Sequence, residues 1–160
     1  MPDVAVAFQF KVPGQQPLAM ALQRFAANIS DFTTYFNDYL LPAWYAHMED
    51  VYATEGSASG QRWAPLTAAY AAWKIKHFPG MPIGVLSGAT MNALTSATDA
   101  NTILNISKRQ MVVGTSMPYA LYLQLGTRRM KARPPLRLTE DFAITAGKLL
   151  QEFGHAAEKA

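Results

Sequence analysis

Residues suited to metal or acid–base chemistry are few and scattered in this sequence. The three histidines, His47, His77 and His155, are far apart, and none has a second histidine three or four residues away on its own expected helix. The acid pairs Glu49-Asp50 and Glu140-Asp141 are adjacent, so on a helix their side chains point about 100° apart and do not readily share one substrate. We therefore expect no metal site, and solvated helix faces at both acid pairs.

The residue sets for nucleophilic and nucleotide chemistry are also missing. The chain has no cysteine, which excludes disulfides, thiolate metal ligands and a cysteine nucleophile. Gly84-Val-Leu-Ser-Gly88 has the wrong spacing for the Gly-x-Ser-x-Gly turn of serine hydrolases, and neither the Walker pattern nor the dinucleotide fingerprint occurs. The sequence therefore predicts a protein that is not an enzyme and uses no cofactor.

A basic run is the one electrostatic feature with functional content. Five cations fall within ten residues without an intervening acid: Arg128, Arg129, Lys131, Arg133 and Arg137. Such a run can neutralise phosphates or pair with acids on a neighbouring subunit. It lacks the aromatic interleaving of single-strand binders, so a subunit interface is favoured over DNA, with Arg128, Arg129 and Arg133 as the expected contacts.

Three large aromatic residues are candidate anchors for the core or for an interface. Trp63 follows a glycine-rich connector and is expected in the core, and Trp73 lies on the next expected helix. Tyr119 opens an apolar segment, 118–125, which should pack against a hairpin or a partner.

The composition indicates a single globular domain, residues 1–160. Half of the residues are hydrophobic and 16% are charged, which is enough apolar surface to form a core. No run approaches the roughly 18 to 20 uninterrupted apolar residues of a membrane span. The start of the chain lacks a basic region followed by an apolar core, so we expect no signal peptide and synthesis in the cytoplasm.

The first part of the chain predicts a strand and a long helix. Apolar residues alternate over 4–12, which is typical of a half-buried strand. A helical period of three and four follows from Leu18, and the flanking positions favour packing on a sheet over a coiled coil. Pro42 should end or kink this helix before a second segment, 43–53. The apolar face of the helix comprises Leu22, Phe25, Ile29, Phe32, Phe36 and Tyr39.

The rest of the chain predicts shorter elements joined by loops. We expect a helix over 68–77 capped by Thr67, a short helix from 87 or 88 to 94, and a hairpin that turns at Lys108-Arg109. A helix or turn over 119–125 and a last helix from Thr139 to about Glu158 complete the chain. Mobile loops are expected at about 54–62 and 127–136. The predicted class is α+β: a small antiparallel sheet of the N-terminal strand and the hairpin, packed against a long helix and shorter helices.

Six short segments between residues 60 and 136 form an ordered series. They are Gly60-Gln-Arg-Trp-Ala-Pro-Leu66 with Lys74, Val85-Leu-Ser-Gly88 with Leu94, Val113-Gly-Thr115, Tyr119-Ala120, Gln124-Leu-Gly-Thr127 and Ala132-Arg-Pro-Pro-Leu136. Their order resembles the virion morphogenesis, or tail completion, proteins of tailed bacteriophages, including Mu-like members. In this chain Lys131 replaces the family's proline, Pro135 replaces its aromatic residue, and Ala-Thr-Met follows the Leu-Ser-Gly segment where the family has a leucine closer to glycine.

The resemblance implies a structural protein of the virion, made in the host cytoplasm. Such a subunit joins a ring, expected to be hexameric, at the head-proximal end of the tail or in the neck. Its partners are copies of itself and the neighbouring tail terminator or tube and head-connector proteins, with DNA in the channel and no membrane. The basic run then lines the channel or clamps a neighbour.

Two other functions stay open at this stage. The basic run and the isoelectric point near 9.2 also suit a sequence-independent DNA-binding module that uses residues 128–137. A hydrolase of cell-wall or peptide substrates is the other alternative, and only the missing acid, base and nucleophile set speaks against it.

Overall fold

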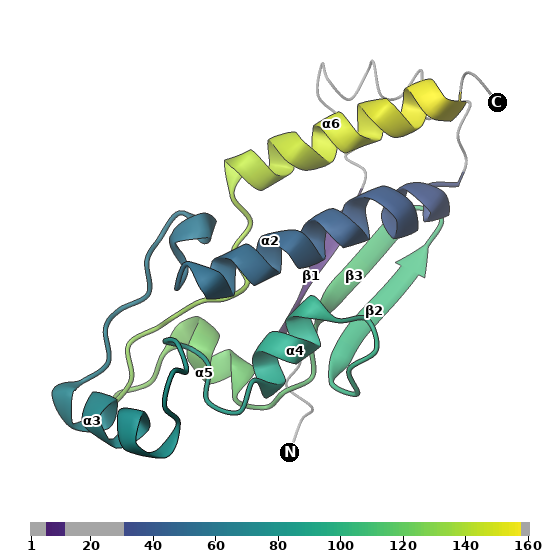
Figure 1. Ribbon diagram of the computed structural model, residues 1–160. Coiled ribbons are helices and arrows are strands. Elements are labelled where there is room, and N and C mark those ends of the chain that lie inside the picture. The colour runs from purple at the N-terminus through teal and green to yellow at the C-terminus, as the bar shows by residue number, and fades with distance from the viewer. Residues whose placement is uncertain (1–5, 12–30, 158–160) are drawn as a thin grey trace.

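The computed structural model describes residues 6–11 and 31–157, and it has the predicted α+β fold (Figure 1). Among these residues no helix is long and apolar enough to cross a membrane. The elements are, in chain order, β1 (Val6–Lys11), the π-helix η1 (Tyr35–Leu40), α2 (Leu41–Ala53), the 3-10 helix η2 (Ser57–Ser59), α3 (Ala68–His77), α4 (Ala89–Thr95), β2 (Thr102–Ser107), β3 (Gln110–Thr115), α5 (Ala120–Leu125) and α6 (Glu140–Ala157).

The N-terminal strand and the hairpin form one antiparallel sheet, as predicted. The strand order is β1-β3-β2, with β3 in the centre. Val113 of β3 lies opposite Phe8 of β1 on one side and Leu104 of β2 on the other. The two-residue connection Lys108-Arg109 turns the hairpin, and the Lys108 carbonyl accepts a 2.8 Å hydrogen bond from the Phe32 amide.

Of the two outcomes predicted for Pro42, an end or a kink, the end is wrong and the kink stays a prediction. Residues 33–53 form one continuous helix in which the hydrogen-bond pattern changes from π to α at Leu41. The Leu41 amide donates to the Phe36 carbonyl, five residues back. Pro42 has no amide and its ring crowds the carbonyl four residues back, so a wider π turn accommodates it without a break. The predicted helical residues from Leu18 to Ile29 lie outside the described residues.

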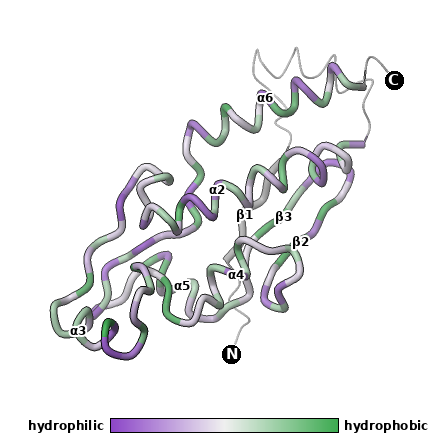
Figure 2. Tube along the Cα trace, viewed as in Figure 1, coloured by the Kyte–Doolittle hydropathy of each residue, from purple (hydrophilic) through white to green (hydrophobic). Residues whose placement is uncertain are grey.

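The helices form two layers over one face of the sheet (Figure 1). α2 and α4 lie against the sheet, and α6 lies over η1 and α2. Trp44, Met48 and Val51 of α2 meet Met111 and Val113 of β3 in a single buried core. Hydrophobic and hydrophilic positions alternate along α6, as expected for a helix that covers others with one face (Figure 2).

The short elements after α2 gather at the end of the molecule opposite the hairpin turn (Figure 1). α3 has the predicted bounds, and the Thr67 hydroxyl accepts a hydrogen bond from the Tyr70 amide at 3.4 Å, as its predicted capping role requires. α4, α5 and α6 also form where the sequence predicts them. The loops that join α3, α5 and α6 carry most of the segments with family resemblance, so this end is the place to look for function.

Candidate interaction surface

Trp63 is the centre of the packing at this end. Its side chain is 4% exposed, and its ring meets Tyr52 edge-on at a centroid distance of 5.4 Å. The indole Nε1 donates to the Pro134 carbonyl at 3.1 Å, which ties the segment before α3 to the segment before α6. Gly84 lies so close to the indole that a Cβ built there would be 2.4 Å from Cζ3. Trp63 therefore holds three loops together from the inside.

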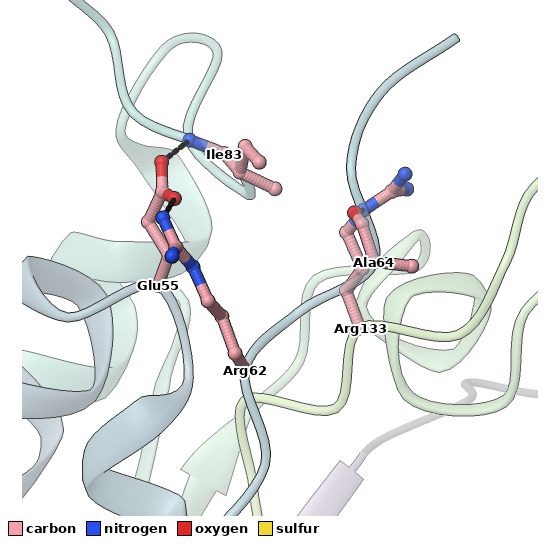
Figure 3. A network of polar contacts seen from close by, with 5 residues as sticks. All are labelled: Glu55, Arg62, Ala64, Ile83 and Arg133. Carbon is pink, nitrogen blue, oxygen red and sulfur yellow. Dashed lines mark hydrogen bonds and ion pairs between the residues drawn. The ribbon is translucent and has the colours of Figure 1, made fainter.

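Arg133 is a buried clamp, which corrects its assignment as an expected contact of the basic run. The side chain is 7% exposed. Its Nε donates to the Ala64 carbonyl at 2.7 Å (Figure 3). Its Nη2 donates to the Pro65 carbonyl at 2.9 Å. One planar guanidinium binds two carbonyls of the segment before α3, a task that suits arginine better than lysine. Charge spacing along the sequence gives no sign of this role.

Glu55 and Lys74 complete the polar part of the framework. One Glu55 carboxylate oxygen accepts from the Ile83 amide at 3.0 Å, and the other lies 3.5 Å from Arg62 Nη2 (Figure 3). Lys74 is buried and its Nζ donates to the Pro82 carbonyl. Burial lowers the pKa of Lys74, the Glu55 carboxylate opposes this shift, and the Arg133 cation adds to it. The sequence shows Lys74 only as one of two lysines on a short helix, so its burial was not foreseen.

A side-chain amide joins α5 to the segment before α6. Gln124 accepts from the Leu136 amide at 3.2 Å and donates to the Leu136 carbonyl at 2.7 Å. Trp63, Gln124 and Arg133 all belong to the segments that carry the family resemblance, and each of them bonds to backbone from another of these loops. These residues therefore stabilise the loops at this end of the molecule, and other side chains form its exposed surface.

An apolar groove of about 500 Å³ opens between α3, α5 and the start of α4. Lys74 and Arg133 reach its wall, and no acidic side chain is among its described lining residues. Its apolar lining includes Leu66, Tyr70, Val85, Leu86, Met91, Tyr119, Tyr122 and Leu123.

Aromatic side chains surround this groove on the outside. Trp73, 42% exposed, stacks between Tyr70 at 5.4 Å and His77 at 4.8 Å. Tyr119 is 41% exposed and Tyr122 is 55% exposed. Of the three predicted anchors, Trp63 thus lies in the core, whereas Trp73 and Tyr119 lie on the surface. Clustered exposed aromatics are typical of protein interfaces.

The four other cations of the basic run are exposed. Thr127 and Met130 exchange two backbone hydrogen bonds of 2.8 and 3.3 Å, so Arg128 and Arg129 occupy the tip of a four-residue turn. Lys131 follows this turn, and Arg137 Nη1 donates to Gln61 Oε1 at 2.7 Å. The basic turn therefore stands beside the groove, because Thr127 and Met130 also line it. Mobility of this loop and of 54–62 stays a prediction.

Charge is divided between two successive parts of the chain. Residues 31–55, which contain η1 and α2, carry acids and no cation: Asp31, Asp38, Glu49, Asp50 and Glu55. Residues 56–139 carry one acid, Asp99, against ten cations: Arg62, Lys74, Lys76, Lys108, Arg109, Arg128, Arg129, Lys131, Arg133 and Arg137.

Comparison with known proteins does not assign this chain to a family. No family model, curated protein or solved structure matches the chain. Within the described ranges, no group of three histidines or acids is placed to hold a metal ion. The surface itself therefore carries the functional argument: an apolar groove, exposed aromatics and a basic turn at one end.

Proposed function

We propose that this chain is a structural subunit of a tailed-phage neck, a tail completion protein that forms a ring at the head-proximal end of the tail and joins the tail to the head connector. The observation that carries the proposal is the end built by α3 and α5. It exposes Trp73, Tyr119 and Tyr122 around an apolar groove, and a monomer would leave this surface in water. The ordered segments that resemble the tail completion family support the same assignment.

The polar groups near the groove also favour assembly over chemistry. Lys74 and Arg133 donate to backbone carbonyls, and Glu55 accepts from a backbone amide, so each holds a loop in place. A catalytic site needs a base, an acid or a nucleophile directed at a substrate position. Here the buried charged groups stabilise the surface, and the exposed aromatics are left to bind a partner.

The mass and symmetry of the purified chain test this proposal. We expect light scattering to give a multiple of 17.6 kDa and negative-stain images to show closed rings. A variant with Tyr119→Ser and Tyr122→Ser should stay folded by circular dichroism and lose the ring, since both side chains are exposed. Arg109→Ser, at the distant hairpin turn, is the control and should keep the ring. A chain that stays monomeric and is absent from phage particles would overturn the proposal.

The alternative proposal is a sequence-independent DNA-binding module. Its specific support is the turn that presents Arg128 and Arg129 at its exposed tip. If these residues bind phosphates, duplex DNA should bind at low ionic strength and dissociate as salt rises, and Arg128→Gln with Arg129→Gln should weaken binding to all sequences alike. Absence of duplex binding at low ionic strength removes this alternative and leaves the assembly proposal intact.

A further inference from the structure

We infer that the ring closes through two unlike surfaces: the basic face of one copy receives the acidic face of the next copy. This inference rests on the proposed ring. The basic face comprises the groove rim, Tyr119 and Tyr122, with the turn residues Arg128 and Arg129 and Lys131. The acidic face comprises exposed residues of α2 and of the start of α6: Glu49, Asp50, Leu138, Glu140, Asp141 and Ile144.

Two helices bring the acidic face together. The His47 ring of α2 lies 4.9 Å from the Phe142 ring of α6, so these two helices, which carry the four acids, are in contact at this point. On α6, Ile144 shares a face with Glu140 and Asp141 because residues three and four apart are neighbours on a helix. Figure 1 shows the start of α6 above the C-terminal half of α2, on the side of α2 away from α4.

Both faces contain apolar side chains that are exposed to solvent. Leu138 is 43% exposed and Ile144 is 50% exposed, and acids lie beside them. On the basic face, Tyr122 is 55% exposed beside the cations of the basic turn. Each face therefore joins exposed apolar side chains to charges mainly of one sign, although Arg137 and Lys148 border the acidic face. A groove of about 500 Å³ has room for aliphatic side chains such as those of Leu138 and Ile144.

Charge complementarity indicates that the groove binds a second copy of this chain. The groove has no acid among its described lining residues and has cations at its wall and rim, so it requires an acidic apolar partner. The start of α6 has this chemistry in the same chain. A twofold contact of groove with groove would instead place Arg128 and Arg129 against the same arginines, which like-charge repulsion disfavours. Contact between unlike faces of identical subunits is the type that closes rings.

Charge reversal tests the contact with folded variants. Arg128→Glu with Arg129→Glu reverses the charge of the basic turn, and Glu140→Lys with Asp141→Lys reverses the charge at the start of α6. Each variant alone should assemble at least about tenfold more weakly than the natural chain, because like charges then meet. An equal mixture should regain the ring, because each face of one variant complements a face of the other. Lys108→Glu with Arg109→Glu, at the distant hairpin turn, changes the net charge equally and should keep the ring.

Cross-linking gives a second readout that does not depend on charge. The chain has no cysteine, so single cysteines report unambiguous pairs. Oxidation of a mixture of Tyr122→Cys and Ile144→Cys should give a dimer that carries one of each. Ser107→Cys, on the hairpin, replaces either partner as the control and should give none.

The outcomes separate the two proposals. Rings that persist in both charge-reversed variants overturn this contact and leave the neck assignment standing. A mixture that fails to regain the ring while both variants stay folded also overturns the contact. A natural chain that forms no ring and is absent from virions overturns the neck assignment and the contact with it.

Discussion

The five cations between Arg128 and Arg137 show how one residue type takes different roles in one short segment. Arg128 and Arg129 extend from the tip of a turn, whereas Arg133 is buried with its guanidinium against two carbonyls. The buried residue stabilises the loop that presents the exposed ones. At the residue scale, position in the turn therefore decides which cations can bind a partner.

Arg133→Met should reveal the clamp. The substitution leaves the Ala64 and Pro65 carbonyls without their donor, so we expect the free energy of unfolding to fall by about 2 to 3 kcal/mol. Arg129→Met removes the same charge at an exposed position and should change stability by less than about 0.5 kcal/mol. Urea unfolding of both variants measures the difference. Equal effects would contradict the clamp.

Trp63→Ala should strongly destabilise the fold. A buried indole and its hydrogen bond to Pro134 are lost together, for which we expect about 3 to 5 kcal/mol and little soluble protein. Trp73→Ala is the control, since Trp73 is 42% exposed, and should cost less than about 1 kcal/mol. Thermal melts and soluble yield compare the two. Unchanged folding of the Trp63 variant would show that the indole is not a core residue.

His47 should make stability depend on pH. Burial lowers its pKa below the ordinary histidine value of 6.5, although Asp50 and the Arg137 backbone oppose the shift. Above about pH 6.5 the His47 imidazole is neutral in both the folded and the unfolded chain. As pH falls below about 6.5, the unfolded chain binds the proton more readily, so folded stability decreases through the lowered pKa.

We expect the natural chain to lose more stability than His47→Gln between about pH 7.5 and about pH 5.5. The variant retains every other titrating group, so the difference isolates His47. Urea unfolding at the two pH values measures it. Equal losses would contradict the burial of a neutral imidazole beside Phe142.

At the scale of elements, the segment between α3 and α4 depends on close approach to Trp63. Gly80 and Gly84 both have positive φ, at +80° and +83°, but their surroundings differ. A Cβ at Gly80 meets nothing within 4 Å, whereas one at Gly84 would be 2.4 Å from the indole. The pair therefore separates the effect of backbone conformation from that of packing.

Gly80→Ala should cost about 1 to 2 kcal/mol for its left-handed backbone alone. Gly84→Ala should cost a further 1 to 3 kcal/mol, about the usual penalty of overpacking, because the indole must move. Denaturant midpoints of the two variants measure the difference. If Gly84→Ala were no worse than Gly80→Ala, the indole would not be held tightly against this segment.

At the scale of the whole molecule, we expect the separation of charge between α2 and the α3–α5 end to act on the proposed association. The acidic residues of α2 and the basic residues of the α3–α5 end belong to one folded chain, so a second copy can approach with opposite charges facing. This arrangement favours contact between unlike faces, whatever the modest net charge of +3.

Self-association should therefore weaken with salt. Screening shortens from about 10 Å at 0.1 M to about 3 Å at 1 M, so exposed charges attract less. We expect the fraction of rings at a fixed protein concentration to fall as salt rises from about 0.05 to about 0.5 M. Sedimentation velocity across this series measures it. Association that strengthens with salt would indicate a contact dominated by apolar burial.

The sequence by itself determined the class and order of the elements. Periodicity of two and of three to four specified the strands and helices, and Thr67 and Lys108-Arg109 marked a cap and a turn, because these signals depend on local backbone chemistry. The helix does not end at Pro42 because a π turn can relieve the penalty for proline, and no local signal in the sequence indicates such a turn.

Only the tertiary structure decided which candidate residues face a partner. Arg133 and Lys74 are buried and Trp73 and Tyr119 are exposed, although charge and size suggest the opposite. Burial and pairing depend on segments far apart in the chain, such as Ala64 beside Arg133 and Pro134 beside Trp63. Spacing along a sequence carries no information about these distances, and that is why the surface could be found only after folding.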